Sequence, residues 1–326
     1  MKKDKYLSRE YTNCLRGIFA IVVVCHHLYQ YIELFNGTRI GSMLEVSGSL
    51  AVSVFFFYSG YGLMLSSQKK DYIKNFFRNR FLPLYCFYVV LIIIYIGWTL
   101  LLEKSIMPQE ILQSFFFGET IVSKGWYLQA TFVLYLLYLF SFAIFKSSKM
   151  QITVFAITIV FYCAFCHFMG LNIWWYQSIL SVILGMLWCC CKDKIDAILN
   201  KYSIVVFVLS LILFAAAYII CNMWTFVILK MIRGLLFVCV TVVFSYILCN
   251  TFIINNLFFN LCGKYSLEIY VSHGLFLRLI KLNIVNNKIV YVLVVIVGTV
   301  VTSLVLKIIY NKIVSLISKK KQPVLN

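Results

Sequence analysis

Long apolar runs recur from one end of the chain to the other, and they constrain the fold more than any other feature. Hydrophobic residues make up 63% of the 326 residues and charged residues only 12%, whereas charged residues form about 25% of a typical soluble domain. Backbone groups in lipid must pair within their own segment, which favours helices. The sequence therefore predicts an all-α, polytopic transmembrane helix bundle. We expect a single integral membrane domain over residues 1–326, with the lipid bilayer as its surroundings.

The apolar runs indicate about ten spans, because a helix needs about 20 residues to cross the hydrocarbon core. The ninth is the weakest, since it is short and polar. Their approximate ranges are 14–34, 46–66, 81–102, 126–145, 152–170, 174–191, 203–222, 225–249, 265–280 and 289–311.

Lysine and arginine residues in the loops predict the orientation. They cluster before the first span, in the loops 69–80, 146–149 and 192–201, and in the tail at 319–321. With ten spans all these segments share one side, so both termini should be cytoplasmic and loop 103–125 external. The same distribution accounts for the net charge of +18, so we expect no nucleic acid as a partner.

The twelve cysteines show no metal-ligand spacing, and most stand alone inside apolar runs. Cysteine packs there as a small hydrophobe. We therefore expect no metal site and no permanently bound cofactor.

Ionisable side chains inside a membrane are costly and usually mark function. Arg16 and His27 are eleven residues apart, almost three helical turns, so they face the same way at an axial separation of ~16 Å. His26 lies about 80° away from that face and shares an i, i+4, i+7 spacing with Gln30 and Glu33. A structural or orienting role for His26 is therefore an alternative to a catalytic one.

The Arg16–His27 face suits a long, slim ligand with an anionic head at the arginine and a reactive end at the histidine. An acyl thioester of coenzyme A has this shape. Burial favours neutral imidazole, and a neutral imidazole can activate a hydroxyl as a general base. The sequence places His27 near the middle of the bilayer. For either histidine alone, helix packing or hydrogen bonding between helices remains the alternative.

At these residues the sequence resembles the bacterial acyltransferase-3 family of integral membrane O-acyltransferases. The stretch "CLRGIFAIVVVCHH" is similar to the opening motif of that family, an Arg-Gly pair followed by a histidine eleven positions after the arginine. Four later stretches also resemble family patterns in the family's order. The matching residues are Arg16, Gly17 and His27; Phe55, Phe56, Ser59, Gly60 and Tyr61; Arg80 and Pro83; Trp126 and Leu128; and Gly263, Ser266, Tyr270 and His273.

The resemblance implies that His27 is the catalytic histidine and Arg16 its essential partner. It implies transfer of an acyl group, most often acetyl, from cytoplasmic acyl-CoA to a hydroxyl of a cell-surface carbohydrate or a glycolipid precursor. It also implies a multi-pass protein of the bacterial plasma membrane, here without an appended extracellular domain. The chain departs from many relatives at Ala130 and Thr131, where a glutamate often follows the tryptophan.

Further side chains are candidates for donor binding or support of the site. Arg78 and Arg80 suit phosphate binding, because arginine matches phosphate bidentately. The alternative is that they only set the orientation of the chain in the membrane. For Ser59 the alternative to lining the site is close helix packing. Glu268 is a lone glutamate in a predicted span and needs a partner, for which Lys230 and Arg233 are the candidates. His167 is interpreted as structural. The candidates are Arg78, Arg80, Ser59, Trp126, Glu268 and His273.

Two other functions compete with acyl transfer. In a proton-coupled transporter or flippase of a glycolipid or small anion, intramembrane histidine and glutamate would carry protons. Transporters often show internal repeats, and no clear repeat is visible here. A polymerase or ligase acting on lipid-linked sugars would favour a larger outer loop than 103–125.

Overall fold

The computed structural model describes residues 5–32, 35–103, 105–116, 118, 120–249 and 256–318, and within these residues it is helical with no strand. Eight helices are long and apolar enough to span a membrane, which confirms the polytopic helical bundle predicted from the sequence. They are α1 (Arg9–Ile32), α2 (Arg39–Ser67), η1 with α3 (Phe77–Phe81 and Leu82–Glu103), α5 (Trp126–Ile144), α6 (Ser148–Phe168), α8 (Lys192–Met223), α9 (Val227–Leu248) and α12 (Lys288–Ser318).

Two of the ten predicted spans hold shorter helices. The range 174–191 contains α7 (Ser181–Cys190), which follows the 3₁₀ turn η2 (Ile173–Trp175), and the range 265–280 contains α11 (Ser266–Leu277). Tight turns with i→i+3 hydrogen bonds adjoin both helices and replace the α-helical pattern. Serine hydroxyls offer the backbone alternatives to a helix, and Ser178 donates to the carbonyl of Ser49 just before α7.

The chain packs as two compact units, each made of two separate stretches. Unit 1 comprises Met1–Lys69 and Ile152–Ser266, and unit 2 comprises Lys70–Gln151 and Leu267–Asn326. Two short helices complete the list, α4 (Pro108–Phe115) in unit 2 and α10 (Leu257–Lys264) in unit 1. The single domain expected from the sequence stays a prediction.

Glycines allow very close helix packing in unit 1. A Cβ at Gly17 of α1 would overlap the carbonyl oxygen of Phe259 in α10, and a Cβ at Gly263 would overlap that of Asn13. Small residues of this kind let helix backbones approach one another in membranes. Gly17 and Gly263 both belong to the stretches that carry the family resemblance, so close packing is a physical reason for their identity.

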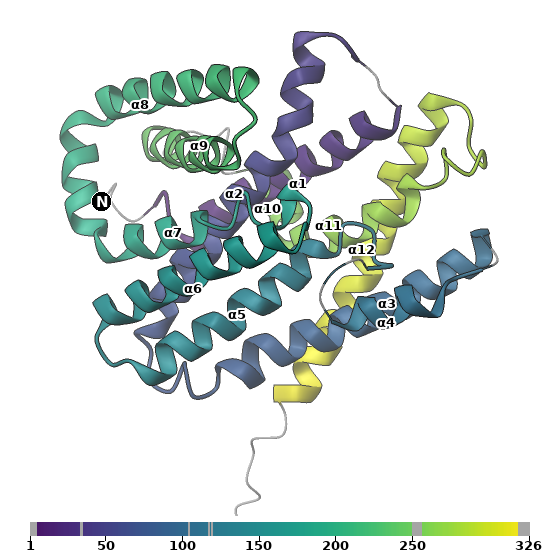
Figure 1. The fold of residues 1–326 in the computed structure, drawn as a ribbon, viewed down its shortest axis with the longest axis horizontal. Helices are drawn as coiled ribbons and strands as arrows, with labels where there is room; N and C mark the ends of the chain where they lie inside the picture. The colour runs from purple at the N-terminus through teal and green to yellow at the C-terminus, as the bar shows by residue number, and fades with distance from the viewer. Residues whose placement is uncertain are drawn as a thin grey trace, which may run out of the picture. The chain divides into compact units, whose positions relative to one another are not determined.

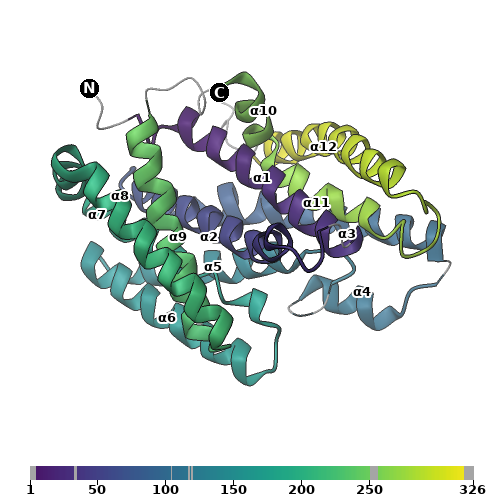
Figure 2. The same cartoon turned by 90° about the horizontal axis from the view of Figure 1, so that it is seen from above.

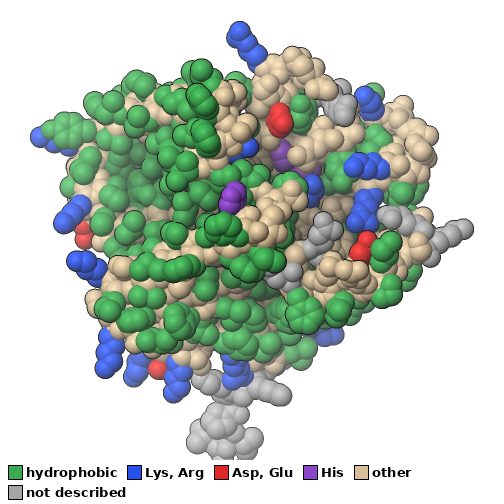
Figure 3. All heavy atoms as spheres, viewed as in Figure 1, with side chains coloured by type: hydrophobic (Ala, Val, Ile, Leu, Met, Phe, Trp, Pro, Cys, Tyr) green, Lys and Arg blue, Asp and Glu red, His purple; other side chains and the backbone are tan. Residues whose placement is uncertain are grey.

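The helix α8 joins a predicted loop to a predicted span. It begins at Lys192 and turns sharply at Tyr202, whose φ of −131° and ψ of 24° are not helical; Figure 1 shows the bend. Beyond the kink, Ile204, Leu209 and Leu213 are exposed, as expected of side chains that face lipid. Hydrophobic side chains cover much of the face drawn in Figure 3.

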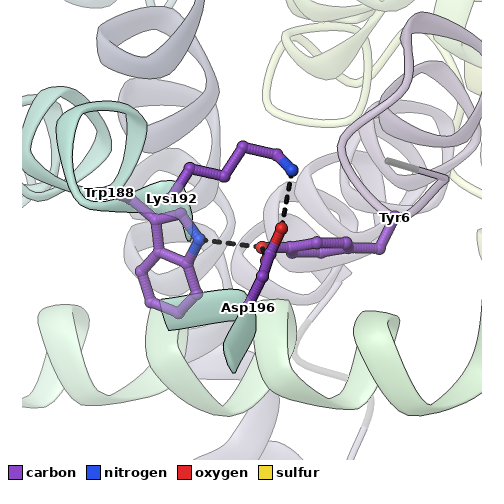
Figure 4. Close-up of polar contacts among 4 residues, drawn as sticks. All are labelled: Tyr6, Trp188, Lys192 and Asp196. Carbon is purple, nitrogen blue, oxygen red and sulfur yellow. Dashed lines mark hydrogen bonds and ion pairs between the residues drawn. The ribbon is translucent and has the colours of Figure 1, made fainter. Parts of the chain in front are cut away.

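A polar cluster fastens the segment before α1 to the junction of α7 and α8 (Figure 4). Tyr6 donates to the buried carboxylate of Asp196 at 2.7 Å, and Lys192 contacts the other oxygen of that carboxylate at 2.7 Å. Trp188 Nε1 donates to the Tyr6 hydroxyl at 3.1 Å. Burial raises the pKa of the Tyr6 hydroxyl well above its ordinary value, so this group remains a neutral donor.

In unit 2, side-chain hydrogen bonds join α11 to its neighbours. Tyr95 of α3 donates to the carbonyl of Val271 at 2.8 Å, and Ser272 pairs with Ser303 of α12 at 2.9 Å. Figure 2 shows α11 as a short helix and α12 as a long one. These bonds connect buried polar groups and therefore fix the position of α11. A helix this short depends on contacts with its neighbours.

Candidate functional site

In unit 1, α1 and α2 form the part of the site around Arg16. Arg16 is half-buried, and its Cζ lies 5.9 Å from the ring centroid of Tyr58, an arrangement typical of a cation–π contact. The Tyr58 hydroxyl is buried and makes no hydrogen bond to any residue that the structure describes. Ser59 follows on α2 and is half-buried. A half-buried cation and a buried hydroxyl therefore lie together at this end of α1.

His27 is buried, and its ring is held by a neighbour on the same helix. Its Nδ1 lies 2.9 Å from Oε1 of Gln30, whose side chain is exposed. An amide oxygen only accepts hydrogen bonds, so Nδ1 donates in this contact, and in the neutral ring Nε2 then carries the lone pair. This is the tautomer that a general base acting through Nε2 requires.

On α1, Gln30 forms its hydrogen bond with His27, although the sequence spacing grouped Gln30 with His26. Residues three apart are neighbours on a helix as well as residues four apart, and the three-residue spacing brings Gln30 to His27. Glu33, the other residue of that grouping, lies outside the described residues.

His26 connects α1 to α2. Its Nδ1 lies 2.7 Å from the carbonyl oxygen of Leu44, to which it donates, and its ring fills the space that a Cβ at Gly48 would occupy. The rings of His26 and His27 have centroids 4.7 Å apart. These contacts support the structural alternative for His26, and they position the neighbouring ring.

The structure shows where His27 lies along α1, while its depth in the bilayer stays a prediction. The helix α1 ends at Ile32, five residues or ~7.5 Å beyond His27 at 1.5 Å per residue. His27 is therefore closer to the carboxyl end of α1 than to its middle. The predicted span 14–34 began five residues later than the helix, which starts at Arg9.

The loop arginines lie in unit 2 on η1, a short π-helix, and such segments often occur at functional sites. Arg78 donates through Nη2 and Nε to the carbonyl of Ile317, at 2.8 and 3.2 Å, near the end of α12. Arg80 lies among three tyrosines and is hydrogen-bonded to Tyr72. The bonds of Arg78 support a structural role, whereas phosphate contact by either arginine stays a prediction.

Glu268 is fully buried at the start of α11 and forms an ion pair with Lys307 of α12, with Oε1 and Nζ 3.2 Å apart. The suggestion that Lys230 or Arg233 is its partner is therefore wrong. The other carboxylate oxygen, Oε2, has no hydrogen-bond partner among the described residues. Spacing along the chain did not reveal this pair, because 39 positions separate its two members.

The other two predicted site residues of unit 2 lie near an aromatic cluster. His273 is fully buried, and its Nδ1 donates to the carbonyl of Ile269 at 3.1 Å. Its ring centroid lies 6.0 Å from that of Tyr270, which confirms their shared helical face. Trp126 stands edge-on to Tyr127 with centroids 6.1 Å apart, and Tyr127 contacts Tyr270 at 5.0 Å.

Residues 9–308 match the model of the acyltransferase domain that defines the acyltransferase-3 family. The chain belongs to this family. Over 188 residues it is 24% identical to the acyltransferase MdmB of Streptomyces mycarofaciens, a similarity that covers 57% of this chain and 43% of that relative. The chain thus spans less than half the length of that relative. No solved structure matches.

The family match includes residues of this chain that the sequence reasoning missed. Lys307 lies inside the last predicted span, and a lysine within an apolar run was the signal that could have found it. The hydrogen bond of Gln30 with His27 was not predicted, although their three-residue spacing could have indicated it. Within the described ranges, no group of three or more His, Cys, Asp or Glu side chains could hold a metal ion.

Proposed function

We propose that this acyltransferase moves an acyl group, acetyl in the first instance, from cytoplasmic acyl-CoA to a hydroxyl of a cell-surface carbohydrate or its lipid-linked precursor. The observation that carries the proposal is the pair on α1. Arg16 is half-buried near one end, and His27 is buried near the other with its proton held on Nδ1. The bacterial plasma membrane is the location that this reaction requires.

The donor would lie along α1. Arginine presents a planar fork that suits phosphate, so Arg16 would bind a phosphate of coenzyme A. The eleven residues to His27 correspond to an axial distance of ~16 Å, which the pantetheine arm can cover. The buried hydroxyl of Tyr58, 5.9 Å from Arg16 by its ring centroid, would offer a further hydrogen bond to the donor.

The acceptor would approach His27 from the opposite end of α1, where Gln30 is exposed. His27 Nε2 removes the proton of the acceptor hydroxyl, and the oxygen attacks the thioester carbonyl carbon. The carbon–sulfur bond of the tetrahedral intermediate then breaks. The proton passes from the imidazolium to the leaving thiolate, so that the products are the ester and free coenzyme A.

Six other side chains are proposed to bind the donor or to support the site. Ser59 lies in unit 1, beside Tyr58, and the other five lie in unit 2. Arg80, with its tyrosine neighbours, is the better phosphate candidate of the two loop arginines, because two NH groups of Arg78 are used by Ile317. The remaining three are Trp126, Glu268 and His273.

The test is acetyl transfer by the purified protein in detergent, with radiolabelled acetyl-CoA and a carbohydrate or glycolipid acceptor. His27→Ala should lower transfer by at least about 1,000-fold, because loss of a general base together with a positioned ring removes most of the chemistry. His26→Ala is the matched control and should keep measurable activity while losing stability. An active His27→Ala enzyme would overturn the assignment.

A proton-coupled transporter or flippase is the second candidate, and the buried Glu268–Lys307 pair favours it, since such pairs can carry protons. The same assay separates the two. Group transfer in detergent needs no membrane gradient, whereas transport needs sealed vesicles. Substrate movement in proteoliposomes without any acetyl transfer would replace the proposed function by transport.

A further inference from the structure

Arg233 of α9 is a buried cation without a counter-ion in the described part of the chain. Its side chain is only 5% exposed, and its Nε makes no hydrogen bond there. No acidic side chain among the described residues forms an ion pair with it. In unit 1 the buried carboxylate, Asp196, is already bonded to Tyr6 and Lys192. An uncompensated buried charge strongly destabilises a protein, so its retention indicates a partner outside the described residues, which a bound ligand can supply.

Two contacts determine the position of Arg233 relative to α1. Phe19 of α1 stacks edge-on against Phe237 of α9 with centroids 6.0 Å apart, and the Tyr11 hydroxyl donates to the carbonyl of Ser245 at 3.2 Å. Tyr11 is eight residues before Phe19, and Ser245 is eight residues after Phe237. The two helices are therefore antiparallel in this register.

The register gives the depth of Arg233. Arg233 lies four residues before Phe237 on α9, and Val23 lies four residues after Phe19 on α1. Because the helices are antiparallel, Arg233 is level with Val23. Val23 is buried and lies one turn before His27 on the same helical face. Arg233 is therefore about one turn, ~6 Å along the axis, from His27, on the side toward Arg16.

We propose that Arg233 is a further catalytic residue, whose guanidinium binds the carbonyl oxygen of the acyl thioester and the negative charge that develops on it. The inference rests on the proposed function. When the acceptor oxygen attacks, the carbonyl π electrons move to its oxygen, and a donor already in place stabilises that oxyanion. Collapse of the intermediate restores the carbonyl and expels the thiolate, so that the charge leaves Arg233 again.

The location between the two ends of the donor supports this assignment over phosphate binding. Along α1, Arg16 lies toward the phosphates and His27 at the reacting end, and Arg233 falls within one turn of the reacting end. Lys230, three residues earlier on α9, is level with His26 and is only half-buried. Lys230 is therefore a cation at a similar depth that differs from Arg233 in its exposure, which makes it the control for charge alone.

The test compares Arg233→Met with Lys230→Met in the purified full-length protein. Arg233→Met should lower kcat by about 100- to 1,000-fold, as loss of an oxyanion donor does, with acetyl-CoA affinity unchanged within about threefold. It should also raise the Tm of the donor-free protein, because an unpaired buried charge is replaced by an apolar side chain of similar length. Lys230→Met should change kcat by less than about threefold.

Arg233→Lys provides a variant that keeps the charge, and it should recover part of the lost kcat. A lower Tm with unchanged kcat in Arg233→Met would mean that Arg233 is structural and would overturn the inference. A parallel loss of donor affinity and kcat would assign it to ground-state anion binding instead. A wild-type protein that transfers no acyl group would reject the proposed function itself, before any variant is measured.

Discussion

Glu268 of unit 2 and Arg233 of unit 1 are both buried charges, but they differ in their partners. In unit 2, Glu268 is fully buried and has its counter-ion within the chain, Lys307, at 3.2 Å. In unit 1, Arg233 is almost as deeply buried and has no acidic partner among the described residues. A charge that is neutralised within the chain contributes to specificity and structure. A charge left without a partner is available to a ligand.

This comparison separates residues that hold the fold from residues that can act. Arg78 and His26 donate to backbone carbonyls, and Lys307 pairs with a carboxylate, so each has a structural explanation. His27 is held through Nδ1 by the side chain of Gln30 on its own helix, which orients the ring as catalysis through Nε2 requires. The three predictions below test the two sides of the comparison.

The largest expected effect is on the ion pair of unit 2. Lys307→Met should lower the free energy of unfolding by about 3–5 kcal/mol, because it leaves the carboxylate of Glu268 buried and uncompensated. Adding Glu268→Gln should restore most of that loss. Denaturation in detergent measures both. Lys312→Met, which removes an exposed lysine of the same helix, is the control, and equal losses in the two lysine variants would refute a stabilising role for the pair.

The next effect concerns donor binding at Arg16. Arg16→Ala should weaken acetyl-CoA binding by about 2 kcal/mol, roughly 30-fold, through loss of a charge-assisted contact in a partly dry site. Arg16→Lys should weaken it less, since lysine keeps the charge but not the fork, and His27→Ala should leave it nearly intact. Calorimetry on the purified protein gives the affinities. Arg9→Ala, an exposed position on the same helix, should have no effect; unchanged affinity in Arg16→Ala would leave Arg16 as an orienting residue.

The smallest effect is expected at Gln30. Gln30→Met should lower kcat about tenfold, or ~1.4 kcal/mol in the barrier, because the imidazole tautomer is no longer fixed. Gln30→Glu should move the acid limb of the pH–rate profile to higher pH, since a carboxylate beside the ring favours its protonated form, which is no base. Asn36→Asp adds the same charge at an exposed loop residue and should not move the profile.

Other titratable groups near this histidine bear on the pH experiment. His26 is on α1 itself, Arg39 and Glu45 are on α2, Lys264 is on α10, and Lys230 and Arg233 are on α9; these three helices contact α1. All of them are present in the wild type and in every variant. A profile that moves equally in Gln30→Glu and Asn36→Asp would therefore report long-range charge, and would exclude a specific bond between Gln30 and His27.

The sequence by itself determined the helical membrane fold, because only helices and closed barrels satisfy backbone groups in lipid and the apolar runs have helical length. It also determined the shared face of Arg16 and His27, since helical geometry within one segment needs no partner. Its errors occurred where a partner mattered. The short α7 and α11 depend on turns held by neighbouring helices, and spacing along α1 allowed Gln30 to meet either histidine.

Only the tertiary structure decided which distant charges meet. The pairing of Glu268 with Lys307 and the register of α1 against α9 both join residues far apart in sequence, where spacing carries no information. The same is true of the absence of an acidic partner for Arg233 within the described residues. Burial and contact are properties of packed helices, so the difference between a structural charge and one available to a ligand appears only once the helices are packed.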